Sequence, residues 1–185
     1  EILAVESLTC TGEHRPRHLL DVLSVDIRPD EIKKRVTRPF SNITLAPYYG
    51  CQCLRPYAEF DDPEAPVSME PLLRAAGADV HRWSVGGKCS GASHMTTRVE
   101  VGEVLVHRIL AAARGADAIV TVCPMCQMNL QGFQNRLTAR YGDDLRISVL
   151  YLPQLLGVAM GLSPQELGLS ENLALLPAMR RHLHM

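Results

Sequence analysis

The chain has 185 residues, of which 46% are hydrophobic and 21% are charged, and its formal net charge is −1. This length suffices for one substantial domain with appendages and is too short for two full α/β domains. Because the charge is near zero and no block of Lys or Arg is present, we expect no nucleic-acid partner. No apolar run is long enough to span a bilayer, so we expect no direct membrane insertion.

The start of the chain and its cysteine content bear on cellular location. The sequence opens on Glu1 instead of Met and lacks a charged-then-apolar leader, so we expect a fragment without a secretion signal. In a small secreted protein six cysteines would indicate a disulfide framework, but this chain is long enough to build a hydrophobic core without one. Two of them form a Cys-x-x-Cys motif, which favours metal or redox chemistry in a reducing, cytoplasmic compartment over structural disulfides.

The predicted elements, in chain order, start with a helical extension at residues 1–41, which contains a short amphipathic helix at 17–23 and a polar helix at 30–37. Strands are predicted at 42–46, 79–84, 118–122 and 146–151, and Pro47 is expected to end the first of them. Helices are predicted at 69–76, 99–113, 124–141 and 153–160. The helix at 99–113 carries one apolar face, formed by Val101, Leu105, Ile109 and Ala112.

This alternation of strands and helices predicts the α/β class. We expect a Rossmann-like, doubly wound parallel sheet of about four strands, preceded by the N-terminal helical extension. The expected division is an extension or interdomain segment at 1–41, a cysteine-rich domain at 42–165 and a C-terminal tail at 166–185.

Four of the six cysteines lie just past the ends of predicted strands: Cys51, Cys89, Cys123 and Cys126. The carboxyl ends of parallel strands open on one edge of a sheet, so these thiols should converge there. Converging thiolates suit a soft metal or an iron–sulfur cluster. Cys123 and Cys126 share one face at a helix start, where free N–H groups favour the thiolate form. A thioredoxin-type dithiol uses the same motif, but does not need thiols from two other strand ends.

The other candidate residues have plainer explanations. Cys10 fits a small buried hydrophobe, and Cys53 is either that or an additional ligand. His94 could be a ligand, a proton donor or an ordinary histidine at a helix start. The glycines around Cys89 match no phosphate-binding pattern and would let the backbone approach a cluster. Simple loop packing accounts for the residues that flank the first cysteine loop, namely Tyr48, Tyr49 and Arg55.

Three motifs together carry a family resemblance. They are Tyr-Tyr-Gly-Cys at 48–51 with Arg55-Pro56, Cys-Ser-Gly-Ala at 89–92, and Val-Cys-Pro-Met-Cys-Gln-Met-Asn-Leu at 122–130. Between Cys51 and Cys89 lie 37 residues, and between Cys89 and Cys123 lie 33. Over most of residues 15–160 the chain resembles the cysteine-rich (CCG) domain in the B subunit of heterodisulfide reductase. Family members generally carry two such domains, and this chain is similar to the C-terminal one.

The resemblance implies an iron–sulfur centre, which in the best-known members is a noncubane [4Fe–4S] cluster held by five cysteines. The implied ligands are Cys51, Cys89, Cys123 and Cys126, with Cys53 a candidate fifth. Where the family has Cys-Cys-Gly, this chain has Ser90, whose oxygen is a hard and poor ligand for iron. Cys53 could compensate only in a tightly folded loop, because residues i and i+2 of an extended loop point apart.

The resemblance also implies chemistry at a disulfide or thiol and assembly with other subunits of a multi-subunit electron-transfer complex. We therefore expect an oxidoreductase subunit that takes part in disulfide reduction or thiol oxidation. Two alternatives remain open, a structural zinc domain with four cysteine ligands and a cluster-free interaction module.

Overall fold

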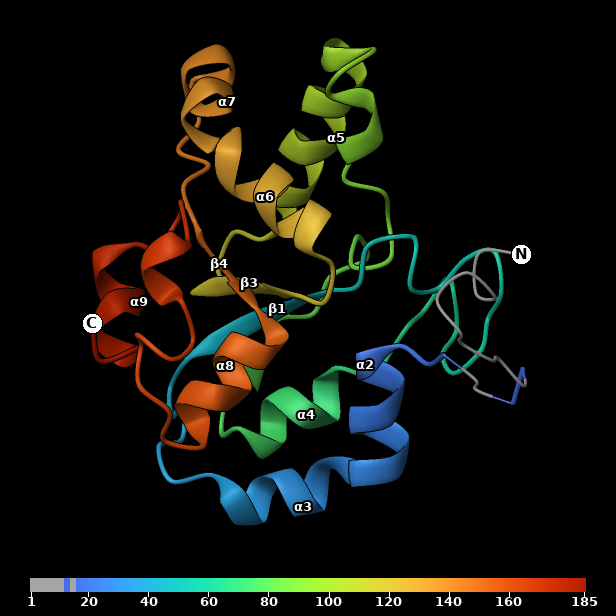
Figure 1. Ribbon diagram of the computed structural model, residues 1–185. Helices are drawn as coiled ribbons and strands as arrows, with labels where there is room; N and C mark the ends of the chain where they lie inside the picture. The colour runs from blue at the N-terminus through green and yellow to red at the C-terminus, as the bar shows by residue number, and fades with distance from the viewer. Residues whose placement is uncertain (1–11, 14–15) are drawn as a thin grey trace, which may run out of the picture.

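The structure is a computed structural model that describes residues 12–13 and 16–185, and its centre is a parallel sheet (Figure 1). The strands in the described residues are β1 (Thr44–Tyr48), β2 (Asp79–Val80), β3 (Ala118–Thr121) and β4 (Ser148–Tyr151). They lie in the order β2-β1-β3-β4, and every neighbouring pair is parallel. The predicted α/β class with a four-stranded parallel sheet is confirmed.

Helices cover both faces of this sheet (Figure 1). One face is covered by α5 (Val99–Ala112), α6 (Pro124–Gly132) and α7 (Gln134–Tyr141). The other is covered by α4 (Glu70–Ala75) and α8 (Leu152–Ala159), and α3 (Arg28–Arg35) packs against α4 on the side away from the sheet (Figure 1). Successive side chains of a strand point to opposite faces, so Ile119 packs under α5–α7 while Val120 packs under α4 and α8. The sheet is therefore doubly wound. No helix in the described part of the chain has the length and apolarity of a membrane span.

Two helices were predicted for the N-terminal extension, and its described residues do contain two helical segments, which meet at Arg28, where φ of +65° and ψ of 150° are not helical. The extension comprises α2 (Leu19–Asp21), a π-helical turn (Val22–Ile27) and α3. Leu20 and Ile32 are fully buried in the same core as α4 and α8. The extension is thus held to the sheet by apolar packing, and the boundary after residue 41 stays a prediction.

The C-terminal segment also contributes to this core. It contains a 3-10 helix (Leu169–Glu171) and α9 (Pro177–His182), and it buries Leu169 and Met179. The segment packs beside β4, where the backbone N–H of Val149 donates to the Ala174 carbonyl at 3.0 Å. The predicted domain boundary at residue 165 likewise stays a prediction.

The prediction that Pro47 ends the first strand is wrong, because Pro47 lies inside β1 and pairs with Val120 of β3. β2 is only two residues long, shorter than predicted, and ends before it reaches Pro47. The side of Pro47 that lacks an N–H group therefore faces no ladder partner. Its carbonyl oxygen accepts a hydrogen bond from the Trp83 indole N–H at 2.9 Å.

The predicted apolar face of α5 is also partly wrong, since Val101 is 41% exposed. The buried positions of this helix are Gly102, Glu103, Val106, Ile109 and Leu110. The sequence pattern did not indicate this face because Glu103 is part of it, and a carboxylate is seldom buried unless it is paired. Here it is 1% exposed and forms ion pairs with Arg136 and Arg140, at 2.6 Å in the case of Arg136.

The predicted long helix after Cys123 is divided in two. Phe133, with φ −103° and ψ −2°, separates α6 from α7. This leaves α6 as a nine-residue helix that starts directly at the second cysteine pair.

We expect Gly91→Ala to destabilise the fold far more than Gly142→Ala. Both glycines have a left-handed φ, +73° and +76°. A Cβ at Gly91 would lie 2.8 Å from the backbone of Gly102 in α5, whereas a Cβ at Gly142 would meet nothing within 4 Å. The left-handed strain costs about 1–2 kcal/mol at either site. The clash at Gly91 adds roughly 1–3 kcal/mol.

Denaturant unfolding of the two variants measures this difference in the free energy of unfolding. Equal losses would contradict the close contact between Gly91 and α5.

Candidate metal centre

The sheet has a topological switch between β1 and β3. The chain leaves β1 toward β2 on one side and then crosses back to β3 on the other side of β1. Helix α4, which joins β1 to β2, and helix α5, which joins β2 to β3, cover opposite faces. The loops after β1 and β3 therefore diverge, and this position at the carboxyl edge is where open α/β sheets bind ligands. Cys51 follows β1 and Cys123 follows β3.

Four thiols lie together at this edge in two pairs. The Cys51 thiol neighbours that of Cys89, and the Cys126 thiol neighbours that of Cys123, since in each case the neighbour raises the pKa of the thiol. The pairs also interact electrostatically, since charge on Cys123 raises the pKa of Cys51 and charge on Cys51 raises that of Cys126. All are free thiols. The structure thus gathers thiols from the loops after β1, β2 and β3.

Burial keeps two of these thiols protonated. Burial raises the pKa of Cys126 to about 12, with a smaller upward contribution from Cys123, while a hydrogen bond from Ser90 opposes the rise. Burial and the neighbouring Cys89 likewise raise the pKa of Cys51. A metal that binds here must displace these protons, so binding is coupled to proton release.

The backbone around the thiols fits closely and offers hydrogen bonds to them. The Gly91 N–H donates to Cys89 Sγ at 3.2 Å, and the Ser90 hydroxyl donates to Cys126 Sγ at 3.5 Å. A Cβ added at Gly50 would lie 2.9 Å from Cys126 Sγ. Glycine at position 50 is therefore required for the backbone to approach this sulfur.

Two further side chains fix the loop that carries Cys89. The Tyr48 hydroxyl donates to the Lys88 carbonyl at 2.7 Å, and the Asn129 amide donates to the Ser90 carbonyl, also at 2.7 Å. Tyr48 and Asn129 are 0% and 3% exposed. The sequence pattern predicted no role for Asn129 and only loop packing for Tyr48. The signal available was their place inside the two motifs that carry the resemblance.

Cys53 is held differently from the four paired thiols. Its Sγ donates to the Tyr49 carbonyl at 3.2 Å, and its side chain packs against the core under α4 and α8. Burial raises its pKa to about 12, with a smaller contribution from Cys123, which places it near the pairs. Its role as a fifth ligand stays a prediction.

The remaining candidates are His94, Cys10 and Arg55. His94 is exposed in a 3-10 helix (Ala92–His94), and Cys10 lies outside the described residues. The Arg55 guanidinium donates to the carbonyls of Gly87 at 3.1 Å and Pro63 at 2.6 Å. Arg55 thus ties the first cysteine loop to the glycine run before Cys89, which agrees with the expected packing role.

The donor set of four thiols has the chemistry that soft metals and iron–sulfur clusters require. Within the described residues, no group of three or more His, Cys, Asp or Glu side chains is placed to hold a single metal ion. The thiols form two adjacent pairs. Sulfur donors and backbone N–H groups directed at sulfur are both typical of iron–sulfur sites.

Comparison with known proteins identifies this region. Residues 45–131, which contain both thiol pairs, match the model of a cysteine-rich domain, CCG. These residues belong to the cysteine-rich CCG domain family. The resemblance predicted from the three motifs is confirmed.

Relatives of the whole chain are subunits of reductases. The chain is 32% identical over 167 residues to the B subunit of the ferredoxin/F(420)H(2)-dependent CoB-CoM heterodisulfide reductase of Methanosarcina acetivorans, covering 87% of this chain and 55% of that protein. It is 33% identical over 174 residues to the 8-methylmenaquinol:fumarate reductase membrane anchor subunit of Wolinella succinogenes, covering 92% of this chain and 61% of that protein. The chain therefore spans little more than half of these relatives.

A solved structure supports the fold of the CCG domain. A hypothetical protein from Helicobacter pylori superposes with a TM-score of 0.59 at 13% sequence identity, covering 81% of this chain and 28% of that one. At this identity the similarity concerns the fold alone.

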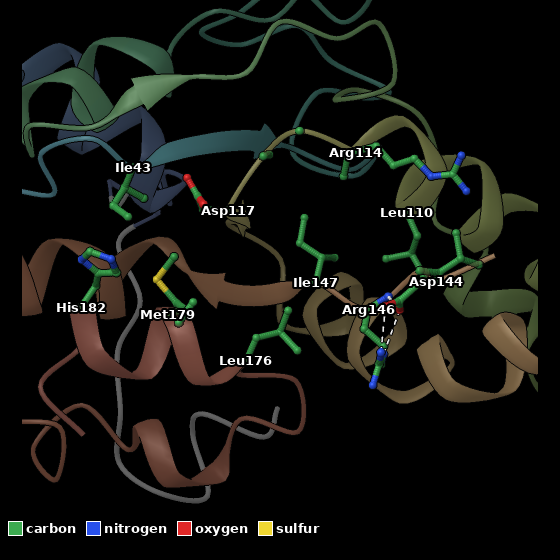
Figure 2. A pocket seen from close by; sticks show the side chains of 15 residues that line it. Ile43, Leu110, Arg114, Asp117, Asp144, Arg146, Ile147, Leu176, Met179 and His182 are labelled. Atoms are coloured by element: carbon green, nitrogen blue, oxygen red, sulfur yellow. Dashed lines mark hydrogen bonds and ion pairs between the residues drawn. The ribbon is translucent and has the colours of Figure 1, made fainter.

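The site of the CCG domain is distinct from a cavity of about 290 Å³ at the opposite edge of the sheet (Figure 2). Ile43 and Asp117, just before β1 and β3, line it together with Met179 and His182 from α9. Asp117 is already engaged, because its carboxylate accepts the Thr44 N–H at 2.7 Å.

We expect Gly50→Ala to weaken metal retention by the CCG domain about tenfold, as loss of a supporting contact does at other metal sites. The new methyl group would push the Cys126 sulfur out of place, since only 2.9 Å separates the two atoms. Metal content per chain, measured after anaerobic purification and a chelator challenge, checks this.

Gly142→Ala is the matched control, because it carries the same left-handed strain without a neighbour within 4 Å. If both variants retain metal equally, the contact between Gly50 and Cys126 has no part in holding it.

Proposed function

We propose that the CCG domain binds an iron–sulfur cluster through Cys51, Cys89, Cys123 and Cys126 and acts in a heterodisulfide reductase-like subunit. There it takes part in disulfide reduction or thiol oxidation within a multi-subunit electron-transfer complex. The observation that carries this proposal is the pairing of four free thiols from three strand-end loops at the topological switch. The named relatives, which are reductase subunits, support the same class of chemistry.

The overall chemistry would be conversion of a disulfide, two electrons and two protons into two thiols, or the reverse. An iron–sulfur centre exchanges single electrons, which lets a two-electron reaction proceed in two steps with electrons from a partner subunit. The chain's own part is to bind and orient that centre. Tyr48, Asn129 and Gly91 do so by fixing the loop of Cys89 and donating to its sulfur.

The exposure of the thiols indicates the side from which a substrate or partner would approach. Cys126 is buried, whereas Cys51, Cys89 and Cys123 are only partly buried. Two methionines of α6 lie beside the second pair with their side chains 51% and 56% exposed, Met125 and Met128. Polarisable, flexible side chains of this kind suit an adaptable contact with another subunit.

Cys123→Ser and Cys126→Ser should each remove most of the bound iron, while Cys10→Ser should leave it unchanged. Serine replaces a soft thiolate with a hard oxygen that binds iron poorly. Iron and acid-labile sulfide, quantified per chain after anaerobic purification, measure the effect. Iron loss in Cys10→Ser equal to that in the other two variants would mean that the site is misplaced.

The same analysis of the unsubstituted chain separates the alternatives. Iron with equimolar sulfide and a brown colour supports the proposal. A colourless protein with one zinc per chain would replace it with a structural zinc domain. A protein free of metal after anaerobic purification would favour an interaction module without a cluster.

Cys53→Ser tests the predicted fifth ligand. We expect it to leave the iron content and the paramagnetic spectrum unchanged, because its thiol is engaged by the Tyr49 carbonyl at 3.2 Å and packs against the core. Iron loss in Cys53→Ser as severe as in Cys123→Ser would instead assign it as a ligand. Comparison of the two variants' spectra distinguishes a change of cluster type from simple loss.

A further inference from the structure

Ser90 stands where the family motif has cysteine, and its side chain is aimed at one of the paired thiols. It is 2% exposed, and its hydroxyl donates to Cys126 Sγ at 3.5 Å. Its backbone carbonyl accepts the Asn129 amide at 2.7 Å, and Asn129 is itself 3% exposed. The Ser90 backbone is therefore bound to Asn129 of α6, and its hydroxyl faces the sulfur of Cys126 on the same helix.

The position of this donor is set by the backbone on both sides. Gly91, next along the chain, has φ +73° and packs against the backbone of Gly102. On the other side, the Lys88 carbonyl accepts the Tyr48 hydroxyl at 2.7 Å. The backbone that carries the Ser90 hydroxyl is thus held in place beside Cys126.

We propose that Ser90, oriented by Asn129, is a positioning residue that donates a hydrogen bond to the Cys126 thiolate and raises the reduction potential of the bound centre. In this chain position 90 would then be a donor to a ligand and not a missing ligand. The inference rests on the proposed iron–sulfur function and adds to it a residue that sets the electron affinity of the site.

The direction follows from charge. Reduction by one electron, supplied in the assay by dithionite through redox mediators, increases the negative charge shared by the thiolate sulfurs. A hydrogen bond to such a sulfur is stronger in the reduced state, so it favours reduction, and hydrogen bonds to sulfur are among the factors that set cluster potentials. The Ser90 bond also opposes the rise in the pKa of Cys126, as expected of a group that stabilises negative charge on this sulfur.

One competing acceptor lies close by. The Tyr48 oxygen is also a hydrogen-bond partner of Ser90, and that bond opposes the strong rise in the pKa of Tyr48 caused by its burial. A hydroxyl has one proton to donate. If Tyr48 receives it, the potential of the centre will not depend on Ser90, and this is the outcome that the experiment must separate.

The test is a potentiometric titration of the full chain, followed by the paramagnetic signal, at matched iron content per chain. We expect Ser90→Ala and Asn129→Ala to lower the midpoint potential. The double variant should lower it no further than the more affected single variant, because both act through one hydrogen bond.

Two control variants remove equivalent buried groups elsewhere. Ser148→Ala removes a buried hydroxyl that accepts the Leu176 N–H at 2.9 Å. Asn172→Ala removes a buried amide that donates to the Val149 carbonyl at 3.1 Å. Both should leave the potential unchanged.

An unchanged potential in fully loaded Ser90→Ala would overturn the proposal and assign the hydroxyl to Tyr48. If Ser90→Ala does not load, the potential of Asn129→Ala decides, since that variant keeps every thiol and the hydroxyl. Loss of iron from both, with both controls loaded, would also overturn it, leaving a purely structural role. The absence of iron and sulfide from the unsubstituted chain would instead be a failure of the proposed function.

Discussion

The parallel pairing of β1 with β3 is the constraint on which the site depends. The register places Tyr48 opposite Thr121 at the carboxyl ends of the two strands. Cys51 then follows three residues after Tyr48, and Cys123 two residues after Thr121. Two segments about seventy residues apart are thereby brought to the same edge at the same height. A shift of register by one residue would reverse every side chain between the two buried faces, so the apolar cores lock this register.

The second constraint is the close approach of the loop backbone to the Cys126 sulfur and to helix α5 at this edge of the sheet. Gly50 lies against the Cys126 sulfur, and Gly91 lies against Gly102 of α5. At both contacts a Cβ would come within 3.0 Å of its neighbour. These contacts bring the loops after β1 and β2 against the helices that follow β2 and β3. The strand order determines where the thiols converge, and the glycines allow the loops to pack closely there.

Much of this arrangement was predictable because it depends on local patterns. The α/β class, the strands and the convergence of four cysteines follow from apolar runs, from turn residues and from the geometry of parallel sheets. Pro47 could not be placed correctly, since its tolerance depends on β2 ending early on the one side where Pro47 has no N–H. The buried face of α5 was missed because Glu103 is buried through two arginines of α7, which lie more than thirty residues away.

The role of Asn129 was equally hidden in the sequence. Its contact with the Ser90 carbonyl joins residues 39 positions apart, and no periodicity or spacing signals such a bond. The sequence could show that Ser90 departs from the family motif, but only the packing shows which sulfur it faces. Long-range polar contacts of this kind connect the fold to the chemistry, and they lie beyond what local patterns carry.

The charge of the clustered thiols links the fold to metal binding. Thiolates gathered at short range repel one another, and here burial adds a desolvation cost that raises the pKa values of Cys51 and Cys126. Two cations on the site's loops offer little compensation, because Lys88 and Arg55 are both paired with Glu64. Backbone and hydroxyl donors offset part of the repulsion at Cys89 and Cys126. If the thiols bind the proposed iron–sulfur cluster, they lose their protons, and the positive iron ions of the cluster would offset the thiolate charge.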